Sequence, residues 1–421
     1  MSKIAYAIKL ITLLCIVINL LSCKEKPGTG NEESYQVSNP SSISKKDNIT
    51  SIDVDLSKES PANYSDLFSS IEYKILKSPA TILVGKIDKI VEAEDRFFLK
   101  SNGKIYIFSE EGNYLSKIDQ KGEGPNQYKS ITDFLVDTVT HHIEILDNHS
   151  FSVFEFDYKG TYIKNWQHGV LSFQFHKLST DNYIFYVDKE LASSYEGRFL
   201  LYNKKKNKIT DNFVPMDKRR IKYEAFMDVN NFCAHPNKTL LSCSGNDTIF
   251  SYKPGTIKPK YIFKFNENTV PKDFYDKKFE SIVEFNEKRL KNEFIGLYYV
   301  DFLENDNYLI SQIVKGKTVY YLWFDKKKKE YRIINRFNDD MTFLKGRIHV
   351  AETFPTYFGP KRALRSLEPE AILAPLDSIQ ATNSDEELKL LFSKVPQLKT
   401  LRESIKLNSN PVIQIMTYKQ G

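Results

Sequence analysis

A repeated segment constrains the fold of this chain more than any other feature of its sequence. Residues 105–118 and residues 153–166 both consist of an apolar run, a turn that contains glycine, and a second run with apolar residues. Gly112 and Gly160 hold the same place in the two segments, so the repeat has a step of 48 residues. A step of roughly 40 to 50 residues is typical of four-stranded β units that pack side by side.

The stretch from residue 118 to residue 166 predicts one such unit. Its short apolar runs are separated by Gly, Asn, Asp, His and Lys, which is the pattern of consecutive antiparallel strands joined by tight turns. The chain also has 25 Tyr and 29 Phe against 2 Trp and 5 Met, and flat aromatic rings favour the pleated surface of a sheet. One such sheet cannot bury both of its faces, so we expect further sheets of the same kind.

Residues 122–160 resemble a propeller blade of the NHL type. They contain, in order, Gly-x-Gly-Pro, an apolar residue followed by Asp, Ile-x-Ile-x-Asp-Asn, and Val-Phe-x-Phe-Asp-x-x-Gly. Residues 122–137 resemble more closely a signature of the six-bladed β-propeller lipoproteins of Bacteroidetes, and residues 246–250 resemble a turn and strand common in that family. The resemblance implies an all-β fold over residues 52–421, a six-bladed β-propeller of four-stranded antiparallel blades.

Alternation of apolar and polar residues predicts two opening strands and then six sets of strands, the second of which is the stretch 118–166. The opening strands are expected at residues 52–56 and 71–76. The other sets are expected at residues 83–90, 96–99, 105–108 and 114–118; 174–178, 183–187, 198–202 and 209–213; 231–235, 239–244, 248–252 and 260–265; 296–302, 308–313, 318–324 and 331–337; and 347–352, 357–358 and 371–374. A last strand at residues 410–418 is expected to pair with strands from far away in the sequence, because a ring of sheets must close on itself.

Two segments with helical spacing are expected as an insertion and an appendage. Apolar residues recur near every third or fourth position over residues 271–294, with Lys and Glu between them. Residues 384–407 form the second predicted helix. Ser384 is a favourable N-cap for it, and Glu386 and Glu387 lie in the first turn, where the helix dipole stabilises negative charge.

The first 22 residues have the pattern of a signal peptide. Lys3 and Lys9 precede an apolar run over residues 10–21 that is too short to stay in a bilayer as a span. The run ends in Leu20-Leu21-Ser22-Cys23, which resembles a bacterial lipobox and implies that Cys23 is acylated and becomes the first residue of the mature protein. An uncleaved signal anchor is the alternative. Residues 23–51 are rich in Gly, Ser, Asn, Pro, Lys and Glu and are expected to form a flexible tether.

These features give an expected location and expected partners. The protein is expected in the cell envelope, attached to a membrane through its lipid, with the outer membrane preferred and the periplasmic or surface side left open. Lys and Arg exceed Asp and Glu by only 60 to 54 and are spread along the chain, so there is no electrostatic case for nucleic acid as a partner. An envelope protein, a peptide or a glycan is expected instead.

Cys233 and Cys243 are the two cysteines left outside the signal and the lipidation site. An exported protein is exposed to an oxidising compartment, and a hairpin of residues 231–235 and 240–244 would bring the two thiols together. A disulfide and a pair of buried thiols are therefore both open.

A glycine-rich loop at residues 122–127 is not a dinucleotide fingerprint, because its sixth position is Gln and no strand–loop–helix context surrounds it. One interpretation is a loop between blades whose glycines adopt positive φ. The other is a ligand loop at the face of the propeller, formed by Gly122, Glu123, Gly124 and Asn126.

No catalytic or metal-binding motif stands out. His141 and His142 are neighbours at a hairpin tip and would point to opposite sides, and His149 is not spaced to join them, so no metal site is predicted. Recurrent Asp residues at strand ends are expected to cap turns through backbone contacts.

The preferred hypothesis is a binding or scaffolding module without a cofactor and without catalysis. The alternative is a Ca²⁺-dependent hydrolase or lyase similar to gluconolactonases and paraoxonases, which hold Ca²⁺ in the central channel with Glu, Asn and Asp. No catalytic residue is assigned under either hypothesis.

Overall fold

The structure is a computed structural model in which six β-sheets and a few helices form most of the described chain. It describes residues 49–187, 195–217, 219, 230–235, 238–243, 245–266, 269–296, 302–342, 344, 347–349 and 357–419. Within each sheet the consecutive strands pair in antiparallel fashion. The prediction of a mainly β chain built from four-stranded antiparallel sheets is therefore confirmed.

The first three sheets each consist of four consecutive strands, in the order of the chain. They comprise β4 (Lys89–Ala93), β5 (Arg96–Ser101), β6 (Lys104–Ser109) and β7 (Tyr114–Ile118); β8 (Asp133–Asp137), β9 (His142–Asp147), β10 (Ser152–Asp157) and β11 (Tyr162–Gln167); and β12 (Gln174–Lys177), β13 (Asn182–Tyr186), β14 (Gly197–Asn203) and β15 (Lys208–Pro215). The predicted sets agree with these sheets except at residues 83–90, where only the last two residues belong to a strand.

The next two sheets are larger because other strands join them. Their own strands are β16 (Phe232–His235), β17 (Lys238–Leu241), β18 (Thr248–Lys253) and β19 (Thr256–Phe265), and then β20 (Ile295–Gly296), β21 (Phe302–Glu304), β22 (Tyr308–Lys315), β23 (Thr318–Asp325), β24 (Glu330–Asn338) and β25 (Arg347–His349). Residues 296–302 were predicted as one strand, but β20 and β21 pair separately with β22.

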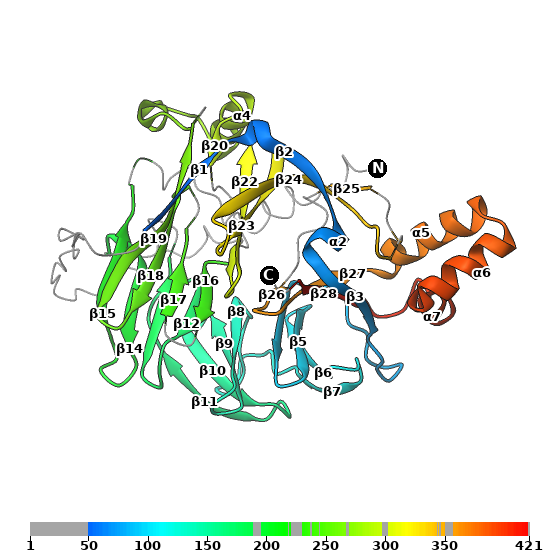
Figure 1. Cartoon of the computed structure of the whole chain (residues 1–421). Helices are drawn as coiled ribbons and strands as arrows, with labels where there is room; N and C mark the ends of the chain where they lie inside the picture. Colours follow the sequence, from blue (N-terminus) through cyan, green and yellow to red (C-terminus); the bar gives the residue numbers. More distant parts are fainter. Residues whose placement is uncertain are drawn as a thin grey trace. The chain divides into compact units, whose positions relative to one another are not determined.

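The amino-terminal part of the described chain runs along the outer strands of these two sheets (Figure 1). β1 (Thr50–Val54) pairs in parallel with β19, and β2 (Glu59–Asn63) pairs in parallel with β24. The short η1 (Leu56–Lys58) and α2 (Tyr64–Leu67) connect β1, β2 and the following strand. Ile52 and Ala62 are almost fully buried by this pairing.

The carboxy-terminal strand and the third strand of the described chain meet in the sixth sheet, whose order is β26, β27, β28, β3. Its strands are β3 (Phe68–Ile75), β26 (Tyr357–Phe358), β27 (Arg362–Leu367) and β28 (Val412–Tyr418). The expected pairing of the carboxy-terminal strand with strands far away in the sequence is confirmed, since β28 lies between β27 and β3. β27 was not predicted.

The helices differ from the prediction in their boundaries and number. The segment 271–294 contains η3 (Lys272–Asp276) and α4 (Ile282–Lys291) rather than one helix. Residues 371–374, predicted as a strand, lie in α5 (Pro369–Thr382), and the predicted helix over residues 384–407 is divided into α6 (Asp385–Lys394) and α7 (Pro396–Ser404). Ser384 caps α6 as predicted, with a reciprocal contact to Glu387. Among the described helices, none is long and apolar enough to cross a membrane.

Buried apolar residues connect each sheet to the next along the chain. Phe98 and Phe134 belong to a core shared by the β4–β7 and β8–β11 sheets, and similar clusters join the later sheets in turn. Leu364 and Ile413 of the sixth sheet share a further core with Phe97 of β5. The last sheet of the chain therefore packs on the first of the four-stranded sheets.

The two glycines of the sequence repeat lie where one sheet approaches the next most closely. Gly112 has φ +83°, and a Cβ atom there would lie 2.4 Å from the carbonyl oxygen of Ile75. Gly160 has φ +84°, and a Cβ atom there would lie 2.4 Å from the carbonyl oxygen of Lys117. Glycine is thus required at both positions for its backbone conformation and for the lack of a side chain.

The predicted signal peptide, the lipidation site Cys23 and the tether up to residue 48 lie outside the described residues.

Candidate functional site

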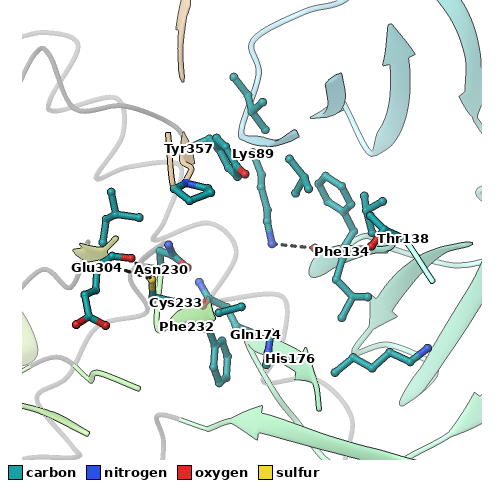
Figure 2. A pocket seen from close by; sticks show the side chains of 18 of the residues that line it. Lys89, Phe134, Thr138, Gln174, His176, Asn230, Phe232, Cys233, Glu304 and Tyr357 are labelled. Carbon is teal, nitrogen blue, oxygen red and sulfur yellow. Dashed lines mark hydrogen bonds between the residues drawn. The ribbon is translucent and has the colours of Figure 1, made fainter. Parts of the chain in front are cut away.

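One strand from each of the six sheets lines a common cavity of about 1720 Å³ (Figure 2). These strands are β4, β8, β12, β16, β21 and β26, and Lys100 of β5 and Thr417 and Tyr418 of β28 also line the cavity. The other strands of each sheet pair beside these strands and contribute few or no residues to the cavity wall. The cavity is the candidate functional site.

A buried carboxylate, that of Asp133, connects three of the lining strands. The Lys89 ammonium of β4 lies 2.6 Å from Asp133 Oδ1 and also donates to the carbonyl oxygen of Phe134 at 2.8 Å. The backbone N–H of Phe175 in β12 donates to the other carboxylate oxygen of Asp133 at 3.3 Å. The Lys89 side chain is therefore held in a fixed position on the wall of the cavity.

His176 and Gln174 face the cavity from β12 (Figure 2). The imidazole of His176 stacks on the ring of Phe232, with 5.6 Å between the centroids. Its position deep in the molecule and the nearby Lys89 ammonium lower the pKa of His176 to about 4, so the ring is neutral at neutral pH. The Gln174 side chain is held by the backbone N–H of Asn231, which donates to Gln174 Oε1 at 2.9 Å.

A second ion cluster joins the β8–β11 sheet to β12. The Lys177 ammonium lies 2.6 Å from Asp137 Oδ2 and also pairs with the buried Glu144. Burial opposes the charged form of Asp137, but hydrogen bonds from Lys177 and Thr140 prevail and lower its pKa to about 2. Burial raises the pKa of Glu144, whose side chain is fully enclosed.

A third cluster surrounds Glu304 of β21. The Lys238 ammonium lies 2.6 Å from Glu304 Oε2, the Lys326 ammonium lies 3.0 Å from Glu304 Oε1, and the Tyr261 hydroxyl also donates to the carboxylate. The backbone N–H of Glu304 donates to the sulfur of Cys233 at 3.4 Å. Burial raises the pKa of the Cys233 thiol to about 11, so it stays protonated at neutral pH.

Three carboxylates of the cavity wall, those of Asp133, Asp137 and Glu304, are thus each held by at least one lysine. Within the part of the chain that the structure describes, no three His, Cys, Asp or Glu side chains gather in a group that could hold a metal ion. The two neighbouring histidines of the hairpin tip contact different carboxylates. His141 lies 3.0 Å from Glu94, and His142 lies 3.4 Å from Glu155.

The structure chooses between the two alternatives for the cysteines. Cys233 and Cys243 are both buried and are thiols, so the disulfide alternative is wrong. Cys233 lies opposite Leu240 in the β16–β17 pair, and Cys243 lies beyond the end of β17. Since the register does not place the two thiols face to face, no bond joins them.

The glycine-rich loop folds around its own glutamine. The backbone N–H of Gly124 donates to Gln127 Oε1 at 2.8 Å, and a Cβ atom on Gly122 would lie 2.1 Å from the same oxygen. The expectation of positive φ at these two glycines is wrong; a Cβ atom at either would require the end of the Gln127 side chain to move. Gly122, Glu123, Gly124 and Asn126 do not line the cavity, and a ligand role for them stays a prediction.

The sequence did not identify Lys89, Gln174, His176 or Glu304 as site residues. Each is one polar residue in or next to a short strand, with no characteristic spacing to the others. A usable signal for Lys89, Gln174 and His176 was their position in the first strand of a predicted set, because β4 and β12 line the cavity. Glu304 lies between two predicted strands and carried no such signal.

Comparisons with known proteins identify a family and a structural relative. The family described as Domain of unknown function (DUF4934) matches residues 48–417. The crystal structure of a Bacteroides fragilis protein to which export is ascribed is similar with a TM-score of 0.66 and 16% identity, over 88% of this chain and 100% of that one. A member of the DUF4221 family from Bacteroides vulgatus matches with a TM-score of 0.48 and 11% identity, over 84% of this chain and 97% of that one. None of the curated proteins matches the sequence.

Proposed function

Since this chain belongs to the DUF4934 family, a family of unknown function, we propose a function from its own architecture. The protein is a six-bladed β-propeller, anchored by a lipid in the cell envelope, that binds a protein, a peptide or a glycan in its central cavity. The observation that carries the proposal is that all six sheets contribute residues to the wall of a single cavity.

The packing of the sheets supports a propeller. Each sheet shares buried apolar residues with the next, and the sixth shares them with the β4–β7 sheet. Pairing β28 with β3 joins strands 341 residues apart in one sheet, as with Gln414 and Tyr73, and a propeller avoids open sheet edges by such a closure.

The amino-terminal sequence supports the envelope location. Residues 1–22 have the pattern of a signal peptide, and Cys23 stands at the acylated position of a lipobox. Export is also ascribed to the similar Bacteroides fragilis protein. Replacing Cys23→Ala is expected to move the protein from the membrane fraction to the soluble fraction, and mass spectrometry of the natural protein should find an acylated Cys23. A mature form that begins at another residue would contradict the anchor.

The chemistry of the cavity wall favours binding over catalysis. Its buried carboxylates are held by lysines, its thiol is protonated, and its histidine is neutral with a pKa of about 4. Groups in these states serve as hydrogen-bond donors and acceptors rather than as a nucleophile or a base at neutral pH.

A cavity-blocking substitution tests the proposal. Residues 24–421 are applied to glycan and peptide arrays and to envelope extracts, and each ligand found is titrated against two variants. Ala234→Trp places a large side chain in the cavity, since Ala234 is an exposed residue of its wall. Ala381→Trp is the matched control, because Ala381 is exposed on α5 away from the cavity. Loss of binding in Ala234→Trp alone supports the proposal; equal binding by both variants refutes it.

A further inference from the structure

We infer that Lys89, Gln174 and His176 form a recognition site for a carboxylate group of the ligand. The inference rests on the proposed binding function of the cavity and specifies the chemistry of one wall.

Lys89 offers a positive charge with one N–H to spare. A lysine ammonium has three donors, and two of them are taken by Asp133 Oδ1 and the carbonyl oxygen of Phe134. Asp133 uses its second oxygen for the Phe175 N–H, so this carboxylate fixes the ammonium beside β12. The third donor of Lys89 is left for a molecule in the cavity.

Gln174 presents its amide nitrogen, because its oxygen is already in use. Asn231 N–H donates to Gln174 Oε1, and no hydrogen bond from the Gln174 nitrogen to another described residue is formed. Gln174 and His176 are two positions apart in a strand and therefore point to the same side. Phe175, between them, points away and stacks on Phe185 in the core.

His176 contributes a neutral N–H. Its ring is fixed by stacking on Phe232, and its nitrogens make no hydrogen bond with another described residue. The wall thus carries three hydrogen-bond donors, one from Lys89 of β4 and two from Gln174 and His176 of β12 (Figure 2). The Lys89 ammonium is the charged one, and it is also paired with Asp133.

These donors suit a carboxylate better than a phosphate. A phosphate group carries about −1.5 to −2 charges at neutral pH and is best held by the bidentate geometry of arginine, whereas the lining residues of the described cavity include no arginine. A singly charged carboxylate matches one ammonium and two neutral donors. Two sources carry such a group: an acidic sugar and the carboxy terminus of a peptide.

Calorimetric titration at pH 7 with matched pairs of probes tests the inference. Digalacturonate is compared with digalactose, and acetyl-trialanine is compared with its carboxy-terminal amide. We expect one of the two acids to bind at least tenfold more tightly than its neutral counterpart, which also identifies the source. If each acid binds no better than its neutral counterpart, or if neither acid binds, the inference is overturned.

Two variants assign the effect to this wall. Gln174→Glu keeps the oxygen that accepts from Asn231 and adds a negative charge, and His176→Phe keeps the stack on Phe232 and removes the N–H. Both are expected to weaken binding of the acid at least tenfold with unchanged circular dichroism, whereas Lys206→Gln, on an exposed turn, is expected to leave it unchanged. Unweakened binding in Gln174→Glu would contradict the site.

Proton uptake gives a second readout. A bound carboxylate raises the pKa of His176 from about 4, so binding at pH 5 should take up protons in the wild type and less in His176→Phe. Suppose that a neutral ligand binds the wild type and Gln174→Glu equally and no longer binds Ala234→Trp. That result would refute the carboxylate site and still support binding in the cavity.

Discussion

Ile415 of β28 lies opposite Glu72 of β3, so the carboxy-terminal strand is held by a strand from the beginning of the described chain. Ile415 is fully buried. Replacing Ile415→Ala should lower the free energy of unfolding by about 2 to 5 kcal/mol, because it removes buried methyl groups and leaves a cavity. Urea denaturation measures the loss. Ile163→Ala, at an exposed position of β11, should change stability by no more than about 0.5 kcal/mol. Equal losses of stability in the two variants would mean that the sixth sheet is not closely packed.

Gly160→Ala should destabilise the protein far more than Gly103→Ala. Both glycines have positive φ, +84° and +70°, but a Cβ atom on Gly160 would collide with Lys117, whereas nothing lies within 4 Å of one on Gly103. The backbone conformation alone costs about 1 to 2 kcal/mol, and overpacking adds about 1 to 3 kcal/mol at Gly160. Thermal melting of the two variants gives the comparison, and similar melting temperatures would show that the sheets do not approach closely there.

Replacing Glu304→Gln should cost about 3 kcal/mol, since it leaves the Lys238 and Lys326 ammonium groups together without the buried carboxylate that compensates them. The control is Glu403→Gln, whose partner Lys399 is 3.9 Å away on an exposed helix surface and whose loss should be nearly neutral. Urea denaturation at low and moderate salt distinguishes the two. A neutral Glu304→Gln variant would contradict the buried cluster.

Acid should destabilise the fold through His168. Its burial lowers its pKa to about 4, below the value of about 6.5 in an unfolded chain. As the pH falls, His168 therefore takes up a proton in the unfolded state before it does so in the folded state. This residue should lower the free energy of unfolding by about 3 kcal/mol between pH 6.5 and pH 4. His168→Phe should reduce the change of the unfolding free energy with pH, and the contribution of His176 should remain. Urea titrations at several pH values give the slope, and an unchanged slope would show that His168 titrates normally.

The sequence predicted strands from apolar runs, several of which are buried on both faces, such as β6 and β9. It missed β27, whose sequence Arg-Ala-Leu-Arg-Ser-Leu contains no such run. Ala363, Leu364 and Arg365 are consecutive and all buried in that strand, so the alternation that marks an ordinary strand is absent. The segment 371–374 was predicted as a strand, but it lies in α5, which continues through Pro375. Pro396 has the opposite effect: Val395 before it leaves the helical conformation, with φ −129° and ψ 75°, and separates α6 from α7.

The candidate site could not be predicted because its residues meet only through the packing of sheets. Lys89 reaches β12 by way of Asp133, and nothing in the spacing of these three elements along the chain marks the contact. The cysteines show the same limit, because the register of β16 and β17 places Cys233 opposite Leu240 rather than Cys243, and the sequence does not fix that register.

The placement of β1 and β2 has a mechanical consequence. Each pairs with only one neighbour and lies outside the strands that build its sheet. Tension applied to the amino-terminal end would reach β1 first and then β2, and their detachment would lengthen the chain while both sheets kept their other strands. A pulling force would therefore detach these two strands before it loads the antiparallel pairs of the two sheets.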